Sequence, residues 1–233
     1  MKEHVCILLC FMNYEHIKTC FDSIYSPNVD YFVLENKSKN SELISEYFLN
    51  KPLKGYLQFE ENIADNAMKV FLAENEPLLR QYKYVTLSDC DLYVENIEST
   101  WQEIRKILEM PGIGICAIDL KLDNFPYDIA KPGDWLPSHI AETPDYIEVN
   151  TGGHLMSMKS ENLAIVTKSR KAVDVCFREI VIWLKLKWVK TKINKAKHLT
   201  WDYYHVGTEY YNFRIANPHI FNQNRTCPYK RLI

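Results

Sequence analysis

Two aspartates that lie two residues apart, Asp89 and Asp91, are the side chains of this sequence best suited to chemistry. They follow the apolar run 84–88, whose Tyr, Val and Leu residues favour a β-strand. Side chains at positions i and i+2 of a strand project to the same side, so both carboxylates can approach one divalent cation and the phosphate oxygens it carries. The spacing predicts a metal–diphosphate site. The tripeptide alone is unspecific, and an Asx turn after a strand would use the same residues.

Strands and helices that alternate along the first half of the chain position this pair. This alternation predicts an α/β fold with a mostly parallel central sheet flanked by helices, in which ligands bind outside the carboxyl ends of the strands. We expect strands at 5–12, 31–34, 55–59, 84–88 and 113–118, and helices at 15–25, 41–49, 64–79 and 96–110.

The second half is less regular, and we expect an elaborated helical C-terminal part. The proline-rich stretch 119–145 is longer than an ordinary connecting loop, and we interpret it as part of the side of a site that binds the acceptor substrate. A strand at 146–149 is expected to run into Asn150, Thr151, Gly152 and Gly153 and to continue at 155–158. A long helix is expected at 173–196. The tryptophans and lysines of 173–197 fit a helix that lies on an anionic membrane surface. They also fit a core or dimer helix with a solvated basic face.

The composition fits one large domain over residues 1–233. The chain is 47% hydrophobic and 13% aromatic, and its net charge of −2 gives no reason to expect a nucleic-acid partner. The segment 159–197 is locally basic, with eleven Lys or Arg against three acidic residues. The seven scattered cysteines indicate reduced thiols, and the N-terminus lacks the pattern of a signal peptide. We therefore expect a cytoplasmic protein, at most associated with the inner face of the membrane.

Four places in order resemble glycosyltransferases of the GT-A fold, most nearly the small bacterial family-two-like enzymes. They are the end of the first strand at Asn13 and Tyr14, Glu35-Asn36-Lys37-Ser38 after the second strand, Glu61-Asn62-Ile63-Ala64, and Asp89-Cys90-Asp91. The family pattern usually has Asp where this chain has Glu35, and Gly where it has Lys37 and Ala64. The resemblance covers roughly the first 120 residues.

The resemblance implies a metal-dependent glycosyltransferase of hexosyltransferase type that uses Mn²⁺ or Mg²⁺. The donor would be a nucleotide-diphosphate sugar, by preference a UDP-sugar. The acceptor would be a saccharide or a lipid-linked molecule in bacterial surface glycan synthesis. Residues 1–118 would bind the nucleotide sugar, and 119–233 would form the acceptor side.

The same resemblance suggests roles for individual residues. The cofactor-binding residues would be Asn13, Glu35, Asn62, Asp89 and Asp91. Asn150, Thr151, Gly152 and Gly153 would contact substrate. A C-terminal His usually completes the metal site of Asp89 and Asp91, and we expect His205, because Gly207 follows it closely, with His198 as second choice. The family's acidic pair with its general base is absent, and Asp202 is the best-placed substitute, with Asp119 and Asp134 as further options.

Two other functions stay open. A haloacid-dehalogenase-like phosphatase also carries Asp-x-Asp at a strand end, but on its first strand, whereas Asp89 follows three strand–helix units. A catalytically degenerate protein that binds sugar nucleotide without turnover would explain the missing base. A nucleotidyltransferase would need a glycine-rich phosphate loop after the first strand, and residues 11–14 contain no glycine.

Overall fold

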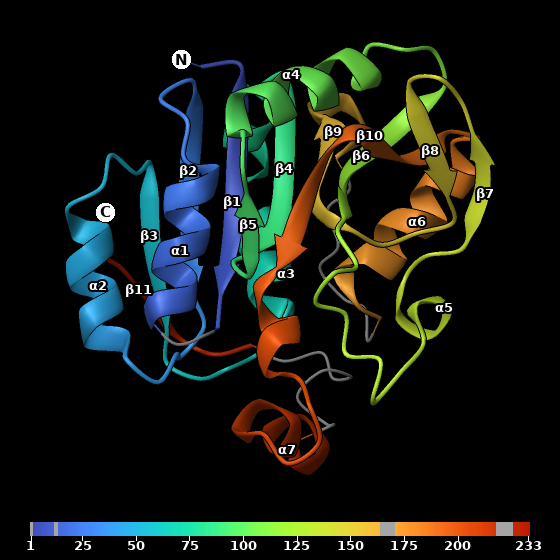
Figure 1. Ribbon diagram of the computed structural model, residues 1–233. Helices are drawn as coiled ribbons and strands as arrows, with labels where there is room; N and C mark the ends of the chain where they lie inside the picture. The colour runs from blue at the N-terminus through green and yellow to red at the C-terminus, as the bar shows by residue number, and fades with distance from the viewer. Residues whose placement is uncertain (1, 12–13, 164–170, 218–225) are drawn as a thin grey trace.

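A central sheet of eleven strands organises the computed structural model, which describes residues 2–11, 14–163, 171–217 and 226–233 (Figure 1). The strand order is β11-β3-β2-β1-β4-β9-β6-β10-β8-β7, and β5 pairs with β10. The strands are β1 His4–Cys10, β2 Val29–Glu35, β3 Gly55–Phe59, β4 Tyr84–Asp89, β5 Leu92–Val94, β6 Ile113–Leu120, β7 His139–Glu142, β8 Tyr146–Val149, β9 His154–Lys159, β10 Lys187–His198 and β11 Tyr229–Arg231.

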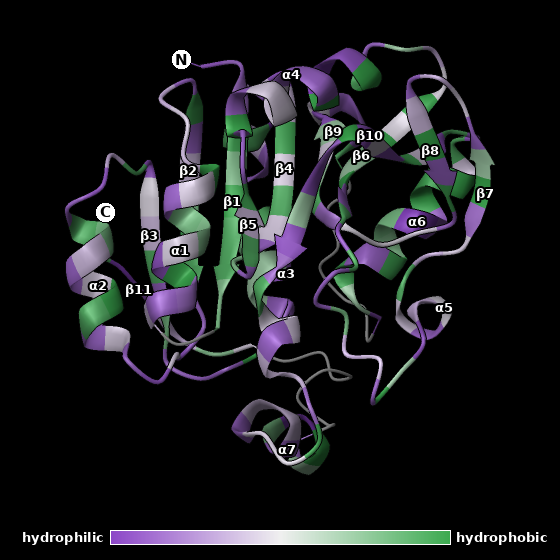
Figure 2. Ribbon diagram, in the orientation of Figure 1, coloured by the Kyte–Doolittle hydropathy of each residue, from purple (hydrophilic) through white to green (hydrophobic). Residues whose placement is uncertain are grey.

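Helices cover both faces of this sheet and divide the core into two clusters. Alternate strand residues such as Cys6 and Leu8 pack against α1, α2 and α4, whereas Val5 and Ile7 pack against α3 and α6. Figure 2 shows the hydrophobic strands between helices whose outer surfaces are more polar. The helices are α1 Tyr14–Ile24, α2 Ser41–Leu49, α3 Asn66–Leu79, α4 Ile97–Leu108, α5 Pro132–Trp135, α6 Val173–Trp183 and α7 Glu209–Ala216, with 3-10 turns η1 Ser160–Asn162 and η2 Leu199–Tyr203.

The sheet is parallel where the sequence alternates regularly and mixed elsewhere. Strands β3, β2, β1 and β4 are parallel neighbours, as predicted, and β6 is parallel to β10. Strand β9 runs antiparallel between β4 and β6, and β8 and β5 pair antiparallel with β10. The expectation of a mostly parallel sheet therefore applies to the first half and is too broad for the second.

The helix expected at 173–196 is wrong beyond its first half. Helix α6 ends at Trp183, Lys185 has a positive φ of 56°, and the chain then enters the twelve-residue strand β10. The buried residues Trp188 and Val189 explain the difference, because β10 is central in the sheet and packs on both faces. The elaborated C-terminal part is thus built around a strand as well as helices.

Two smaller expectations also change. The strand expected to continue from 146–149 into 155–158 is two strands in different places, since β8 pairs with β7 and β10 while β9 lies between β4 and β6. The stretch 119–145 contains the short elements α5 and β7. Among the described residues, no helix has both the length and the apolar character needed to cross a bilayer.

Candidate metal centre

Three side chains from distant parts of the sequence converge at one end of the sheet: Asp91, His154 and His198. Nε2 of His154 lies 3.5 Å from Oδ1 of Asp91, and Nε2 of His198 lies 3.5 Å from Oδ2. One ligand atom from each residue falls within 4.8 Å of the other two. Because the side chains are only 12–17% exposed, this is a largely enclosed group of an oxygen and two nitrogens.

Neighbouring strand ends bring the three together. Asp91 follows β4, and its carbonyl accepts a hydrogen bond of 2.7 Å from the amide of Leu199, directly after His198. His198 is the last residue of β10, in register with Leu92 of β5. His154 begins β9, in register with Ile118 of β6. The cluster thus depends on β9 and β10, both in the second half of the chain.

Thr200 orients two of the three side chains. Its hydroxyl lies 2.7 Å from Nδ1 of His198 and donates to Oδ2 of Asp91 at 3.2 Å. If Nδ1 of His198 carries the hydrogen and donates to Thr200, its Nε2 keeps a free lone pair toward Asp91. The ring of Trp201 stacks on His198 with centroids 4.7 Å apart. These contacts hold the imidazole in a ligating orientation.

The group fits a divalent cation on two further observations. Within the described chain, the buried atoms Oδ1 of Asp91 and Nδ1 of His154 have no hydrogen-bond partner. A carboxylate with two imidazoles is a donor set that accepts Mn²⁺, Fe²⁺ or Zn²⁺, whereas Mg²⁺ prefers oxygen ligands. Mn²⁺ therefore suits these residues better than Mg²⁺.

Electrostatics keep Asp91 and His154 in ligating protonation states at neutral pH. Burial favours the neutral carboxyl of Asp91, but His198 and His154 outweigh it and hold the pKa of Asp91 below its usual range. Burial lowers the pKa of His154 to about 4, with Asp91 opposing and His198 and Lys190 reinforcing the shift. His154 is thus neutral and its lone pair is available.

Asp89 lies beside this group without belonging to it. It ends β4 with an exposed side chain. Desolvation and the Asp91 carboxylate raise the pKa of Asp89, while Arg214 of α7 lowers it. Helix α7 lies at the carboxyl end of β1, where the rings of Phe213 and Phe11 are 5.5 Å apart (Figure 1). The positive charge of Arg214 thus acts on the first aspartate.

Glu35 and Asn62, which were expected to contact the nucleotide, hold loops together in this structure. Asn13 lies outside the described residues. Glu35 is fully buried, and its carboxylate accepts hydrogen bonds from the amide of Ser38 and, at 3.4 Å, from the hydroxyl of Ser41. Oδ1 of Asn62 accepts from the side chain of Asn36 and the amide of Ala64, each at 2.9 Å. These two roles in nucleotide binding stay predictions.

At two positions the backbone conformation fits the glycine of the family pattern, although the side chain is not glycine. Lys37 and Ala64 occupy places where the family pattern has glycine, and they have positive φ angles of 57° and 52°. L-residues adopt this left-handed region at a cost, so glycine is the usual residue there. At both positions the backbone thus has the conformation that glycine favours.

The loop 150–153 lies against β6, next to His154. Gly153 has φ of 125°, and a Cβ there would come within 2.5 Å of the Ala117 Cβ, so only glycine fits. Oδ1 of Asn150 accepts from the amide of Ser138 at 2.8 Å, and Gly152 packs against Pro137. The buried hydroxyl of Thr151 has no hydrogen-bond partner in the described chain. The predicted substrate loop thus adjoins the metal-ligand group.

The residues predicted to act as general base, and the histidine preferred as metal ligand, form other contacts in this structure. Asp119 contacts Lys190 and Lys195, and Asp202 pairs with Lys197 at 2.8 Å. Asp134 of α5 accepts a hydrogen bond from the amide of Lys131, the residue directly before the helix. His205, the preferred metal ligand, pairs with Asp128 at 2.9 Å on the surface, and the structure places His198 in the group instead.

Sequence reasoning missed His154 as a ligand. His154 directly follows the predicted substrate loop 150–153, but no spacing motif connects positions 91, 154 and 198. The available signal was that His154 opens a strand next to a glycine pair, which places it near the sheet edge carrying Asp91. The antiparallel insertion of β9 between β4 and β6 makes the connection.

Comparison with solved structures shows the fold. A mannosyltransferase, PcManGT from Pyrobaculum calidifontis, solved with GDP-Man and Mn²⁺, superposes with a TM-score of 0.60 at 14% identity, over 98% of this chain and 66% of that one. GalNAc-T7, solved with UDP, GalNAc and Mn²⁺, superposes with a TM-score of 0.54 at 9% identity, over 84% of this chain and 43% of that one. The chain has the GT-A-like fold of nucleotide-sugar transferases, which confirms the fold that the resemblance implied.

Sequence comparison finds relatives in a virus. Uncharacterized protein L142 of Acanthamoeba polyphaga mimivirus is 28% identical over 244 residues, covering 96% of this chain and 49% of L142. Uncharacterized protein L137 of the same virus is 28% identical over 223 residues, covering 88% of this chain and 30% of L137. No protein-family model matches the chain. The chain spans about half or less of these relatives.

Proposed function

We propose that this chain is a metal-dependent glycosyltransferase that moves a hexosyl group from a nucleotide-diphosphate sugar to a saccharide or lipid-linked acceptor. The observation that carries the proposal is the Asp91–His154–His198 group, which lies at the carboxyl end of β4 in a GT-A-like fold. The two solved relatives with TM-scores above 0.5 reported above carry Mn²⁺ with a nucleotide or nucleotide sugar. A UDP- or GDP-sugar is therefore the donor class to test first.

The residues of the site would have the following roles in the reaction. Asp91, His154 and His198 would hold the cation, which when bound supplies positive charge to a departing diphosphate. Arg214, which acts on Asp89 from α7, would add a second positive charge near the leaving group. Asp89 would accept hydrogen bonds from donor hydroxyls. The base stays a prediction between Asp119 and Asp202, both of which are in ion pairs.

The cellular setting is part of the proposal. All seven cysteines are free thiols, which supports a reducing compartment such as the cytoplasm. Contact with a membrane was expected through 173–197. The surface proposed for it is now only the end of α6, where Ile182, Trp183 and Leu184 are exposed beside Lys185. Trp188 is buried in the sheet and cannot contribute. A role in bacterial surface glycan synthesis stays a prediction from the resemblance, and the matched relatives are viral.

A donor screen tests the proposed function. The melting temperature is measured with MnCl₂ and each of a panel of UDP- and GDP-sugars, since a ligand at 100 times its Kd adds about 2.7 kcal/mol. We expect one donor to stabilise the protein only with Mn²⁺ and to release its nucleotide slowly. Asp91→Asn should abolish both effects while far-ultraviolet circular dichroism stays unchanged. Donor turnover in EDTA, or in Asp91→Asn, would contradict the proposal.

The same assay separates the rival functions. Binding of the donor without nucleotide release, with and without a saccharide acceptor, would indicate a degenerate binding protein. Release of inorganic phosphate from a phosphoester by the chain would indicate the phosphatase. The phosphatase is not expected, because Asp89 ends the fourth strand and not the first.

A further inference from the structure

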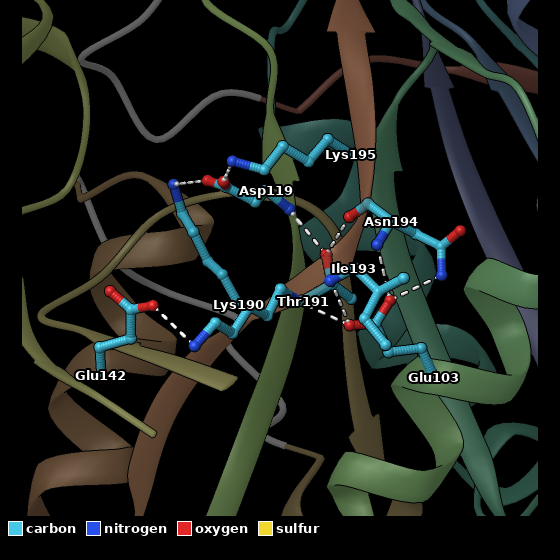
Figure 3. Close-up of polar contacts among 9 residues, drawn as sticks. Glu103, Asp119, Glu142, Lys190, Thr191, Ile193, Asn194 and Lys195 are labelled. Carbon is cyan, nitrogen blue, oxygen red and sulfur yellow. Dashed lines mark hydrogen bonds and ion pairs between the residues drawn. The ribbon is translucent and has the colours of Figure 1, made fainter. Parts of the chain in front are cut away.

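A three-residue bulge in β10 creates an unusual arrangement of charge beside the metal-ligand group. On β6, Ala117 and Asp119 are two residues apart, but their partners on β10 are Lys190 and Lys195, five residues apart. In a regular strand, residues five apart point to opposite faces. The bulge removes this restriction, and both lysines turn toward the one carboxylate of Asp119 (Figure 3). Bulges often re-aim side chains near functional sites.

The bulge is held by a buried carboxylate from another element. Glu103 of α4 accepts hydrogen bonds from the amides of Lys192, Ile193 and Asn194, each at 2.8 Å, and from the side-chain amide of Asn194 at 2.7 Å. The hydroxyl of Thr191 donates to the carbonyl of Asn194 at 2.6 Å. The amides of residues 192–194 are thus fixed, so the positions of Lys190 and Lys195 are set by the fold (Figure 3).

The cluster carries an excess positive charge, and one of its two lysines is buried. Lys195 contacts Asp119 at 2.9 Å, whereas Nζ of Lys190 is 3.4 Å away, beyond the 2.7–2.9 Å of a good charge-assisted bond. The side chain of Lys190 is only 7% exposed, and burial lowers its pKa. Glu142 lies near Lys195, but it is at the surface and pairs with Lys192 at 2.7 Å. A buried ammonium with one long contact retains donors for a further partner.

This cluster lies beside the metal-ligand group. Asp119 follows Ile118, the register partner of His154, and the charge of Lys190 acts on the His154 imidazole. The loop of Gly153 packs on Ala117, the register partner of Lys190, and the same loop holds the unpartnered buried hydroxyl of Thr151 among the described residues. A donor group and a cationic cluster therefore adjoin the metal ligands on the side away from β1 and β2.

We propose that Lys190 and Lys195, held around Asp119 by the bulge of β10, form a subsite for an anionic group, a carboxylate or a phosphate, on the saccharide substrate. The inference rests on the proposed function and makes it more specific: the chain would act on acidic or phosphorylated saccharides. Both anions share the oxygen chemistry that an ammonium pair recognises.

Binding of small saccharide probes tests the subsite. Methyl β-D-glucuronide, glucose 6-phosphate and the neutral methyl β-D-glucoside are titrated into the protein with MnCl₂ and GDP by calorimetry. We expect at least one anionic probe to bind about tenfold or more tightly than the neutral one, because a hydrogen bond to a charged group contributes roughly this much or more. The anion that binds better identifies the source of the charge.

Three variants show whether the lysines cause the preference. Lys190→Met should reduce it to less than about threefold, and Lys195→Met should reduce it in part, since the remaining ammonium then pairs with Asp119. Lys187→Met, on the same strand but paired with Glu148, should keep it. Lys195 is 43% exposed, so its variant stays interpretable if Lys190→Met does not fold. Equal binding of all three probes, or a preference unchanged in Lys190→Met and Lys195→Met, would overturn the inference.

Failure of the subsite and failure of the proposed function give different results. If Mn²⁺-dependent donor binding is observed but no anionic probe is preferred, only the anion subsite is wrong. If anionic probes bind through the two lysines but no donor binds with Mn²⁺, the transferase proposal is wrong and the anion site remains.

Discussion

At the scale of single residues, the choice between two histidines decides where the metal lies. His154 is in the converging group, and His205 is in a surface pair with Asp128. We expect His154→Ala to weaken Mn²⁺ binding by at least about tenfold, measured by electron paramagnetic resonance of free Mn²⁺. His205→Ala, the matched control, should bind Mn²⁺ as the unchanged protein does. If His205→Ala weakened Mn²⁺ binding and His154→Ala did not, the metal ligand would be His205, as preferred from the sequence.

A lysine in the left-handed region gives a second residue-level prediction. Lys37 is exposed and has φ of 57°, a conformation that costs an L-residue roughly 1–2 kcal/mol. Lys37→Gly should therefore increase the free energy of unfolding by up to about 1 kcal/mol, after the entropy cost of glycine is subtracted. Urea denaturation measures the change. Lys39→Gly, in the same loop without a positive φ, should give no gain, and equal effects of the two substitutions would refute the explanation.

His4 makes the stability of the fold depend on pH. Its Nε2 lies 2.7 Å from the Thr86 hydroxyl, and burial, with a smaller contribution from Arg105, lowers its pKa to about 3. Above pH 6.5 the imidazole is neutral in both the folded and the unfolded state. Between pH 6.5 and 3 the unfolded chain binds a proton that the folded chain does not, so stability falls as the pH falls.

The size of this effect can be isolated with one variant. His4→Asn removes the titrating group. As the pH falls, the unfolding free energy of the unchanged protein should therefore decrease more than that of this variant. This difference should approach about 1.4 kcal/mol per pH unit below pH 6. Urea denaturation in EDTA at pH 7, 5.5 and 4.5 measures it. Parallel pH profiles for the two proteins would show that folding leaves the pKa of His4 unchanged.

At the scale of elements, the bulge of β10 depends on a single helix residue. Glu103 is buried and accepts three backbone hydrogen bonds and one from a side chain. In Glu103→Gln, an amide N–H₂ group would face one of those backbone donors and the negative charge would be lost. We expect a loss of roughly 2–4 kcal/mol in unfolding free energy by urea denaturation. Glu98→Gln, earlier on α4, should cost only a few tenths.

The elements also show what the sequence could and could not reveal. The early strands and helices were predictable because each βα unit has its own apolar period and breaks. Strand β10 was missed because apolar residues of α6 and β10 follow one another closely and the whole run fits a helical stripe. The signal against a helix was the pairs of lysines two residues apart, at 185 and 187, 190 and 192, and 195 and 197, which are typical of a strand. The bulge itself depends on Glu103, 89 residues away from Lys192, and has no local signature.

The same limit explains the candidate site. Asp91 was predictable because a strand leads directly into it. His198 was one of two candidates, and only the pairing of β10 with β5 distinguishes it from His205. His154 and the Lys190–Asp119–Lys195 cluster depend on β9 and β10 lying next to β6. Such long-range pairings are decided by packing across the sheet, which local periodicity does not encode.

At the scale of the whole molecule, the two halves expected from the sequence, 1–118 and 119–233, are interleaved in one sheet. Strand β9 of the second half lies between β4 and β6 of the first, β10 pairs with the other edge of β6, and β11 pairs with β3. The first half thus leaves β6 without a strand on either side. We propose that the chain folds as one cooperative unit.

A truncation tests this interleaving. A fragment of residues 1–118 should show no cooperative thermal transition by circular dichroism, because β6 would expose both rows of backbone hydrogen-bonding groups and the core residues beneath β9 and β10 would be in water. The control is a chain that lacks only 226–233. It loses the edge strand β11 of three residues and should still melt in a single transition, at a lower temperature. If residues 1–118 melt cooperatively near the temperature of the full chain, the nucleotide-sugar half is an independent domain, and the metal-ligand group would then be assembled between two folding units.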